Sequence, residues 1–424
     1  MGAIEQILEA APQRIHQHRA AEIVVKVEDR TGKPVPNAKV EVCQTRHAFL
    51  FGCNVLGGDL GTEEEIAKFR EHFAALFNYA TLPFYWSDYE PEKGKTLNVY
   101  INELLDWCAE NKITTHGHPL VWNHHASTPE WLPQEPQEVL RVCEERVKGL
   151  VEEFNGRINV WSVINEPTDC FREETVDFVP YRGVITDTWQ WMGKIPFSRH
   201  FFTIARQANP GATLMINDYR RDVAYEELIE QLIEDSDMPT TDAIGIQAHM
   251  HGKYWGAPYL WNICQRFARF GLPLHFTEAT LISGKHRRQE DIDWDDINPN
   301  WHSTLHGEKR QARNVAEFFT LLFSHPAVEA ITWFELLDGG WLGAPGGLLR
   351  RDRHRTPKPV YRTLMNLIKG EWWTNAAAKT DQEGRCVVRA FFGDHQITVE
   401  HRSVKETVRY QHLKCADHAL KIII

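Results

Sequence analysis

Eight short apolar or β-rich runs recur along the chain, and stretches with helical patterning separate them. The runs are residues 48–54, 79–83, 114–122, 158–165, 213–218, 243–249, 272–278 and 329–334. Helix-like stretches between them include residues 63–76, 97–111, 136–154, 199–207 and 312–323. Alternating β and α units predict an α/β protein with parallel strands, and eight such units predict a closed (β/α)8 or TIM barrel. An open doubly wound sheet is the alternative, but no Gly-rich phosphate-binding turn follows any run.

The two ends of the chain carry a different pattern. Residues 23–42 and residues 380–399 each alternate apolar and polar side chains around turn signals, which suggests a hairpin at each end. The pair resembles two halves of a carboxypeptidase-regulatory-like β-sandwich with the barrel inserted between them. The predicted organisation is an N-terminal helix at 1–20, sandwich halves at 21–47 and 371–424, and the barrel at 48–370. Two independent hairpins on the barrel are the alternative, although so few strands are rarely stable alone.

Composition narrows the classes of partner. The net charge is −11, and no stripe of Lys or Arg stands out, so a nucleic-acid partner is not expected. The N-terminus lacks the apolar core of a secretory signal, and no run reaches the roughly 18 apolar residues of a membrane helix. We therefore expect no membrane association. The expected location is the cytoplasm, or the exterior if a signal has been removed. Eight cysteines without a CxxC pair suit a reducing compartment.

Two glutamates carry the predicted chemistry. Glu166 follows the run VWSVIN, and Glu278 ends the run LHFTE, so both stand at strand tips on the rim that bears the active site of such barrels. Glycoside hydrolysis needs such a pair, with one carboxyl protonated for the leaving oxygen and the other ionised. The long loops expected after the fourth strand (168–196) and the seventh strand (282–308) are typical of a functional rim.

Over residues 48–370 the sequence resembles glycoside hydrolase family 10, the endo-β-1,4-xylanase family. Six motifs carry the resemblance in the order of the family. They are GHPLVW at 117–122, WSVINEP at 161–167, NDY at 217–219, IGIQAH at 244–249, FTE at 276–278 and ITWFELLDGGW at 331–341.

The resemblance implies a role for each matching residue. Glu166 is similar to the general acid/base and Glu278 to the nucleophile of a retaining enzyme. Asn165 would bond the sugar 2-hydroxyl in the −1 subsite, and His249 would donate to the nucleophile. The other substrate-binding residues that the resemblance implies are Gln247 beside the acid/base, His118 and Trp122 lining the −1 subsite, Asn217 and Tyr219, and the aromatic walls Trp333 and Trp341.

Three stretches depart from the family pattern. The family run E-N-x-M-K-W is shortened here to TLPFYW at 81–86, in which Trp86 matches and Tyr85 stands where the family has Lys. His125, in WNHH, replaces a family Gln, and Ala279 and Thr280 replace the L-D that follows the nucleophile. The glycone side is therefore expected to be remodelled, while the hydrolytic pair is retained.

The predicted function is retaining hydrolysis of β-1,4-xylosidic bonds in xylan or xylo-oligosaccharides, without cofactor or metal. The same mechanism on another β-glycan or glycoside stays open, as does a non-catalytic glycan-binding barrel. A metal-dependent hydrolase is a further alternative, because His116 and His118 form an HxH on a strand and His249 and His251 repeat that spacing.

Overall fold

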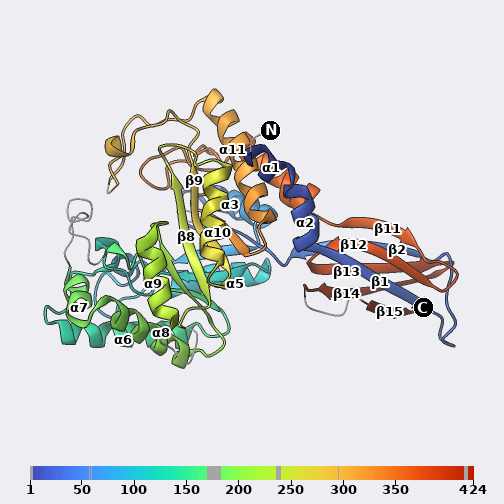
Figure 1. Cartoon of the computed structure of the whole chain (residues 1–424), viewed down its shortest axis with the longest axis horizontal. Coiled ribbons are helices and arrows are strands. Elements are labelled where there is room, and N and C mark those ends of the chain that lie inside the picture. The colour runs from blue at the N-terminus through green and yellow to red at the C-terminus, as the bar shows by residue number, and fades with distance from the viewer. Residues whose placement is uncertain are drawn as a thin grey trace.

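A closed barrel of parallel strands forms the larger part of the molecule (Figure 1). The computed structural model describes residues 3–56, 58, 60–169, 183–234, 240–294, 296–414 and 419–424. Strands follow one another around the barrel in chain order, and the last closes onto the first. They are β3 (Leu50–Asn54), β4 (Tyr79–Pro83), β5 (Thr114–His118), β6 (Val160–Asn165), β7 (Thr213–Asp218), β8 (Ala243–Met250), β9 (Leu274–Leu281) and β10 (Val328–Trp333). The predicted (β/α)8 barrel is confirmed.

Helices follow the strands and cover the outside of the barrel (Figure 1). The main ones are α3 (Glu63–Leu76), α5 (Asn98–Glu110), α6 (Pro136–Glu153), α7 (Val184–Met192), α8 (Lys194–Ala208), α9 (Val223–Glu234), α10 (Ala257–Ala268), α11 (Leu305–Ser324) and α12 (Pro359–Asn366). Shorter turns are α4 (Trp86–Tyr89), η1 (His125–Ser127), η4 (Gln289–Asp291) and η5 (Leu367–Glu371). Local sequence explains their starts: Thr62 and Glu65 form a capping box at α3, and Pro136 occupies the first turn of α6.

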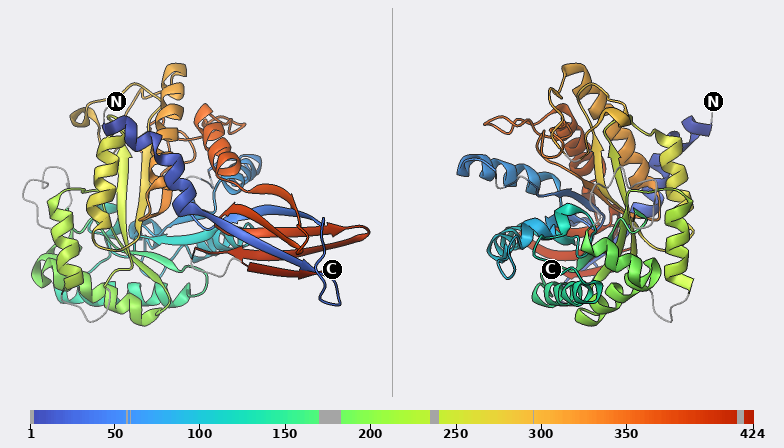
Figure 2. Two further views of the ribbon diagram at one scale, coloured as in Figure 1. Left: turned by 45° about the vertical axis from the view of Figure 1, so that its right-hand side comes forward. Right: turned by 90° about the vertical axis from the view of Figure 1, so that its left-hand side faces the viewer.

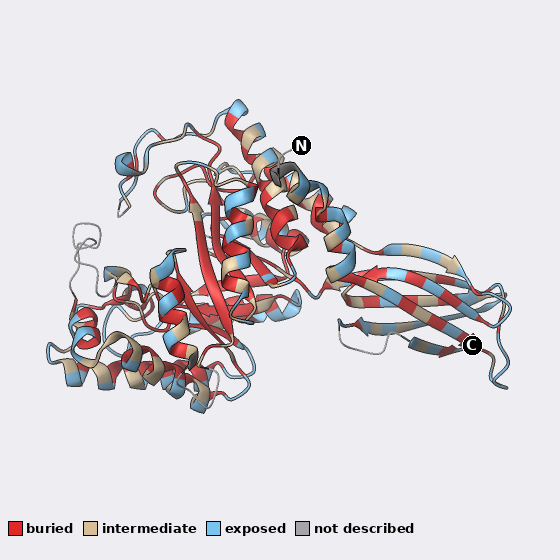
Figure 3. Ribbon diagram, in the orientation of Figure 1, coloured by how far each residue is buried: buried red, intermediate tan, exposed pale blue. Residues whose placement is uncertain are grey.

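Barrel strands are buried along most of their length (Figure 3). Every residue of β6 and of β9 is buried, because helices cover one face of each strand and the barrel interior encloses the other. Continuous apolar runs are typical of such strands. This is why the sequence pattern locates them well.

Two strand ends differ from the prediction by more than two residues. The third strand was expected to reach Trp122, but β5 ends at His118, since Pro119 has no N–H to donate to the ladder. The seventh strand was expected to end at Glu278, but β9 continues to Leu281, paired with the end of β8. Glu278 therefore lies within a paired strand, which limits its movement.

The two chain ends build two further sheets beside the barrel (Figure 1). One has the order β12-β1-β15 and the other the order β11-β2-β13-β14. The strands are β1 (Ala20–Glu28), β2 (Lys39–His47), β11 (Asn375–Lys379), β12 (Arg385–Phe391), β13 (Gly393–His401), β14 (Val404–His412) and β15 (Ala419–Ile423). Buried apolar residues of both sheets, among them Val25 of β1 and Ile397 of β13, form one shared cluster.

The hairpins expected at the two ends are not formed. β1 pairs with β12 and β15, whereas β2 pairs with β11 and β13, so β1 and β2 lie in different sheets. β12 and β13 are likewise separated. Each sheet thus combines strands from before and after the barrel. The likeness to a carboxypeptidase-regulatory domain and the exact domain limits stay predictions.

Two short helices, rather than the single one expected for residues 1–20, precede β1: α1 (Ala3–Glu9) and α2 (Ala11–Arg19). The left view of Figure 2 shows α2 leading from the barrel into β1. Arg19, buried at the end of α2, donates to the carbonyl oxygens of Phe323, His325 and Val328. These three bonds fix the start of β1 to the end of α11 and the beginning of β10. Within the described ranges, no helix has both the length and the apolar character needed to cross a membrane.

Candidate active site

Glu166 stands at the carboxyl end of β6 in an unusual backbone conformation. Its φ is +53°, in the left-handed region that side chains with a Cβ seldom adopt. The Glu166 backbone N–H donates to the carbonyl oxygen of Asn217 at 2.8 Å, which holds it against β7. Such strained backbone persists where the surroundings enforce it, and it is concentrated at functional sites.

Two donors from different elements hold the Glu166 carboxyl group. The indole N–H of Trp122 donates to Oε2 at 3.0 Å, and the amide of Gln247 on β8 donates to Oε1 at 2.9 Å. Both carboxyl oxygens therefore have a fixed orientation. The resemblance implied that Gln247 helps to hold the acid/base; the structure shows its contact with Glu166, and the role itself stays a prediction.

The surroundings of Glu166 favour its protonated form. Burial raises the pKa of Glu166 well above its usual value, and the carboxylates of Asp169, Asp218 and Glu278 add to the rise. The hydrogen bond from Gln247 acts in the opposite direction but is outweighed. A carboxyl group held protonated in this way can serve as a general acid near neutral pH.

Glu278, in β9, has donors instead of acidic neighbours. The Asn217 amide donates to Oε1 at 2.8 Å, and His249 Nε2 lies 3.0 Å from Oε2. His118 Nε2 lies 3.7 Å from Oε1. Burial alone would raise the pKa of Glu278, but the hydrogen bond from His249 and the nearby imidazole of His118 outweigh it, so the pKa lies below its usual value. These neighbours therefore favour the ionised form of Glu278.

A chain of side-chain amides connects the two glutamates. Asn165 Oδ1 accepts from Asn217 at 2.8 Å and from Gln247 at 3.4 Å. Asn217 also holds Glu278, and Gln247 also holds Glu166. Three amides thus link Glu166, after β6, to Glu278 on β9 through β7 and β8. Thr277 adds a 2.6 Å bond to Asn217 Oδ1, which fixes which way that amide points.

Aromatic rings gather around the pair. Tyr85 packs edge-on to His118, with ring centroids 5.8 Å apart, and lies 6.0 Å from Trp122. Burial and then the charges of Glu278 and Glu166 raise the pKa of the Tyr85 hydroxyl well above its usual value, so it stays a neutral donor near both carboxylates. The Trp341 ring lies 4.5 Å from His249 on the nucleophile side.

Four predicted residues lie in other surroundings. Trp86 is buried, with its indole N–H bonded to Glu90 and its ring beneath the Arg146 guanidinium. Trp333 is buried and donates to the carbonyl oxygen of Gly346. His125 is exposed beside His124, and the Tyr219 hydroxyl donates to Asp169 at 2.6 Å. Direct contact of these four with a sugar stays a prediction.

The sequence did not single out Asp169 and Asp218. Asp218 ends β7 and accepts from the backbone N–H and the hydroxyl of Thr168, while burial and the charge of Asp169 raise its pKa to about 7. Both carboxyls belong to motifs already noted, since Asp218 is the Asp of NDY and Asp169 follows NEP by two residues. The signal available in the sequence was therefore an acidic residue within the first motif and another two residues after the second. Most of the long loop after β6, residues 170–182, lies outside the described residues.

One histidine of each pair in the metal alternative is bonded to other groups, whereas among the described residues neither ring nitrogen of His251 has a hydrogen-bond partner. His116 contacts the hydroxyls of Thr81 and Ser162, and His249 contacts Thr280 and Glu278. Across the residues that the structure describes, no group of three or more His, Cys, Asp or Glu side chains is arranged to hold a metal ion.

Comparison with known sequences places most of the chain in one family. Residues 43–367 match the sequence model described as Glycosyl hydrolase family 10. Endo-1,4-beta-xylanase B of Thermotoga neapolitana is 26% identical over 296 residues, which cover 67% of this chain and 78% of that protein. Anti-sigma-I factor RsgI6 of Acetivibrio thermocellus is 25% identical over 401 residues, 93% of this chain and 47% of that protein. Endo-1,4-beta-xylanase 1 of Arabidopsis thaliana is 24% identical, over 90% of this chain and 36% of that protein. The chain therefore spans less than half the length of the last two relatives.

Solved structures show the same fold. Xylanase 10B from Thermotoga petrophila RKU-1, solved in complex with xylobiose, has a TM-score of 0.60 at 22% identity and covers 76% of this chain and 95% of that chain. Native xylanase 10B from Thermotoga maritima has the same TM-score and identity, with coverage of 76% and 96%. At this identity, the likeness shows the barrel fold alone.

Proposed function

Because this chain belongs to glycosyl hydrolase family 10, we propose that it is a retaining glycoside hydrolase that cleaves β-1,4-xylosidic bonds in xylan or xylo-oligosaccharides. The observation that carries the proposal is the opposite tuning of two linked glutamates. Burial and acidic neighbours raise the pKa of Glu166, whereas donors on both oxygens lower the pKa of Glu278. One acid and one carboxylate are what double displacement at a sugar carbon requires.

The mechanism uses both glutamates twice. In the first step the Glu278 carboxylate attacks the anomeric carbon, while Glu166 gives its proton to the leaving glycosidic oxygen. In the second step the ionised Glu166 takes a proton from water, and that water displaces Glu278 from the sugar. Two inversions at the same carbon leave its configuration unchanged, and the second step returns both glutamates to their starting states.

The amide chain supplies the positioning. Asn165 has its oxygen bonded to Asn217 and Gln247, so its amide N–H groups are the ones left to meet a sugar hydroxyl in the −1 subsite. A bond to the 2-hydroxyl that tightens in the transition state contributes to rate rather than to substrate binding alone. His118, Trp122 and Tyr85 would line the same subsite, and Trp341 would close its nucleophile side.

Xylan is the substrate class supported by the xylanases among the relatives. The glycone side is built differently from the usual family pattern, with Tyr85 in place of a Lys and an apolar run before it. A neutral hydroxyl in this position suits a neutral sugar chain. Another β-glycan or glycoside is the competing substrate for the same two-step chemistry.

The decisive experiment follows the first product by proton NMR. Purified wild-type protein is expected to release the β-anomer from xylan or xylohexaose, and Glu278→Ala is expected to lower turnover by roughly 10⁴-fold or more, because no covalent intermediate can form. Azide is expected to rescue the variant on an aryl xyloside and to yield an α-glycosyl azide.

Three outcomes would contradict the proposal. An initial α-anomer would exclude a nucleophilic Glu278, and unchanged turnover by Glu278→Ala would do the same. Tight binding of xylohexaose without hydrolysis over hours would favour a glycan-binding barrel. Hydrolysis of another β-glycan with little action on xylan would keep the mechanism and change the substrate.

A further inference from the structure

Glu335 is a buried acid that the proposed reaction does not use. It lies two residues after β10 and is only 2% exposed. Oε1 of its carboxyl group has no hydrogen-bond partner among the residues that the structure describes. Burying a carboxyl oxygen that has no hydrogen-bond partner lowers the stability of a fold. A native protein that retains such a group usually has a structural or functional reason for it.

The other oxygen of Glu335 holds the backbone of a glycine-rich loop. Oε2 accepts the backbone N–H of Trp341 at 2.8 Å, and the N–H of Gly340 also bonds to the carboxyl group. The loop closes tightly around this group. A Cβ on Gly340 would lie 2.8 Å from Oε2, and one on Gly346 would lie 2.3 Å from Oε1. Glycine at both positions therefore lets the loop wrap around the acid.

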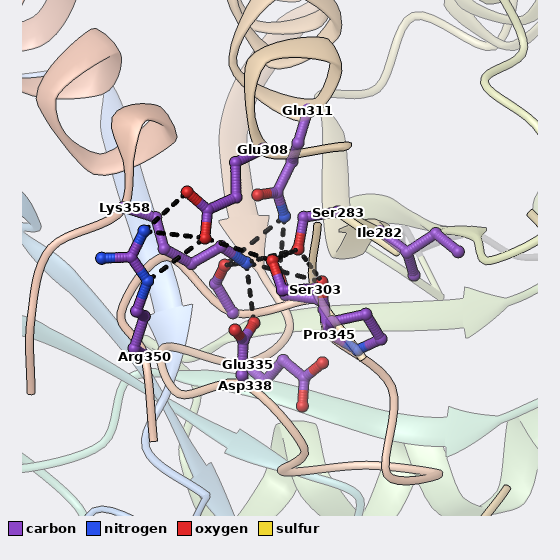
Figure 4. Close-up of polar contacts among 12 residues, drawn as sticks. Ile282, Ser283, Ser303, Glu308, Gln311, Glu335, Asp338, Pro345, Arg350 and Lys358 are labelled. Atoms are coloured by element: carbon purple, nitrogen blue, oxygen red, sulfur yellow. Dashed lines mark hydrogen bonds and ion pairs between the residues drawn. The ribbon is translucent and has the colours of Figure 1, made fainter. Parts of the chain in front are cut away.

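A separate network braces the two ends of the same loop (Figure 4). Lys358 Nζ donates to Asp338 Oδ1 at 2.7 Å, to Ser283 Oγ at 2.8 Å and to the Gly347 carbonyl oxygen at 2.8 Å. Glu308 and Arg350 form a paired salt bridge beside it. Lys358 holds residues 338 and 347, and the bond from Glu335 holds Trp341 in the middle of the loop, next to the bond from the Asn298 backbone N–H to the Leu342 carbonyl oxygen.

The middle of the loop touches the nucleophile's partner. The Trp341 indole lies 4.5 Å from the His249 ring, and His249 Nε2 is bonded to Glu278 Oε2. On the other side of His249, Nδ1 contacts the hydroxyl of Thr280 at 3.2 Å. The methyl group of Thr280 borders the same pocket as Glu335, since it lies 2.9 Å from the Cβ position of Gly346. Two of the contacts that orient the His249 ring, those with Trp341 and Thr280, thus adjoin the Glu335 carboxyl, and the Phe334 ring packs on the same imidazole at 4.7 Å.

We propose that Glu335 is a positioning residue for the nucleophile: by holding the Trp341 backbone it keeps the indole against His249, and His249 in turn orients Glu278. This inference rests on the proposed nucleophilic role of Glu278. Burial, opposed by the hydrogen bond from Trp341, raises the pKa of Glu335 to about 8, so the group accepts these bonds as a neutral acid at neutral pH.

The test compares Glu335→Ala with Glu335→Gln, because glutamine keeps an oxygen for the Trp341 N–H. Glu335→Ala is expected to raise the acid limb of the kcat/KM profile on an aryl xylobioside by about half to one pH unit, because a loosened His249 no longer lowers the pKa of Glu278. kcat is expected to fall more than KM changes. Glu335→Gln is expected to restore both. If Glu335→Ala does not fold, Glu335→Asp replaces it in the comparison with Glu335→Gln. Its side chain is one methylene shorter, which draws the carboxyl group away from the Trp341 N–H.

Other titratable groups near Glu335 and Glu278 also influence the pH profile. Those facing Glu335 are Asp338 and Lys358 from its own loop and Cys53 from β3. Those facing Glu278 are His249, His118 and, across the site, Glu166 and Tyr85. The matched control is Glu329→Gln, an exposed glutamate on β10, which is expected to leave the profile unchanged.

Imidazole ¹⁵N NMR separates failure of this inference from failure of the proposed function. The His249 signal, assigned by its loss in His249→Gln, is expected to change its chemical shift in Glu335→Ala and to recover in Glu335→Gln, whether or not the protein hydrolyses xylan. An unchanged His249 chemical shift and an unchanged acid limb, with only a lower melting temperature, would overturn the positioning role. An inactive wild type with the expected NMR change would overturn the proposed function alone.

Discussion

The two sides of the candidate site contain the same functional group in opposite surroundings. On the β9 side, Glu278 is bonded by Asn217 and His249, and its pKa is lowered. On the β6 side, Glu166 has Asp169 and Asp218 nearby, and its pKa is raised. Burial acts on both groups in the same direction. The difference therefore comes from the neighbours.

This difference supports the proposed roles of the two glutamates. A carboxyl group surrounded by donors is stable as an anion, and one surrounded by carboxylates is stable with its proton. The donors that lower the pKa of Glu278 come from β7 and β8, whereas the acids that raise the pKa of Glu166 come mainly from β7 and the turn after β6, with a smaller contribution from Glu278 itself. Changes on one side should consequently alter one limb of a pH profile and leave the other in place.

The largest effect is expected from removing the proton donor. Glu166→Ala should lower kcat/KM on xylan by roughly 10²- to 10⁴-fold, because the leaving sugar oxygen needs a proton. The loss should be far smaller on a dinitrophenyl xylobioside, whose leaving group departs unprotonated. Steady-state kinetics on both substrates measures the contrast, with Glu103→Gln, an exposed change on α5, as the control. Equal losses on the two substrates would mean that Glu166 is not the acid.

An intermediate effect is expected from removing a donor on the nucleophile side. His249→Ala deletes a bond to a charged group, worth about 1.5–3 kcal/mol, so kcat should fall roughly 10- to 100-fold. The pKa of Glu278 should rise toward its usual value. Since Glu278 must be ionised to attack, the acid limb should then move to higher pH. A pH series of kcat/KM tests this, and a shift of the alkaline limb instead would reverse the comparison.

The smallest effect is expected from removing one charge on the acid side. Asp169→Asn takes away a carboxylate that raises the pKa of Glu166, while an amide keeps the contact with the Tyr219 hydroxyl. The pKa of Glu166 should fall, so activity should be lost at a lower pH, with the alkaline limb displaced by roughly 0.5–1 unit. The acid limb should stay as in the wild type. An unmoved alkaline limb would remove Asp169 from the account of Glu166.

Local pattern was enough to predict the barrel and to place Glu166 and Glu278 near the carboxyl ends of their strands. The strands at 79–83 and 213–218 have the predicted bounds, because a buried parallel strand is a nearly continuous apolar run. The hairpin prediction was wrong because the pairing of a strand, unlike its burial, is not determined by the local pattern. Alternation at β1 indicates a strand with one buried face, but its partner begins at Arg385, and no local signal identifies a partner so distant.

The individual contacts of the site were less predictable. Trp333 and Trp341 belong to one motif, yet the first donates to a backbone carbonyl within the fold and the second packs on His249. Glu335 stands between them in that motif, and only the folded loop reveals that its carboxyl holds Trp341. Such roles depend on which residues meet across strands, and spacing along one strand does not contain that information.

The pairing of β1 and β2 has a consequence for how the chain is assembled. Their strand partners, β11, β12, β13 and β15, all follow the barrel in sequence, so neither strand can be covered until a ribosome has moved past the entire catalytic region. Through most of synthesis these strands keep exposed edges, which is the condition that favours association between nascent chains. The two sheets can therefore form only after the barrel between their strands has been synthesised.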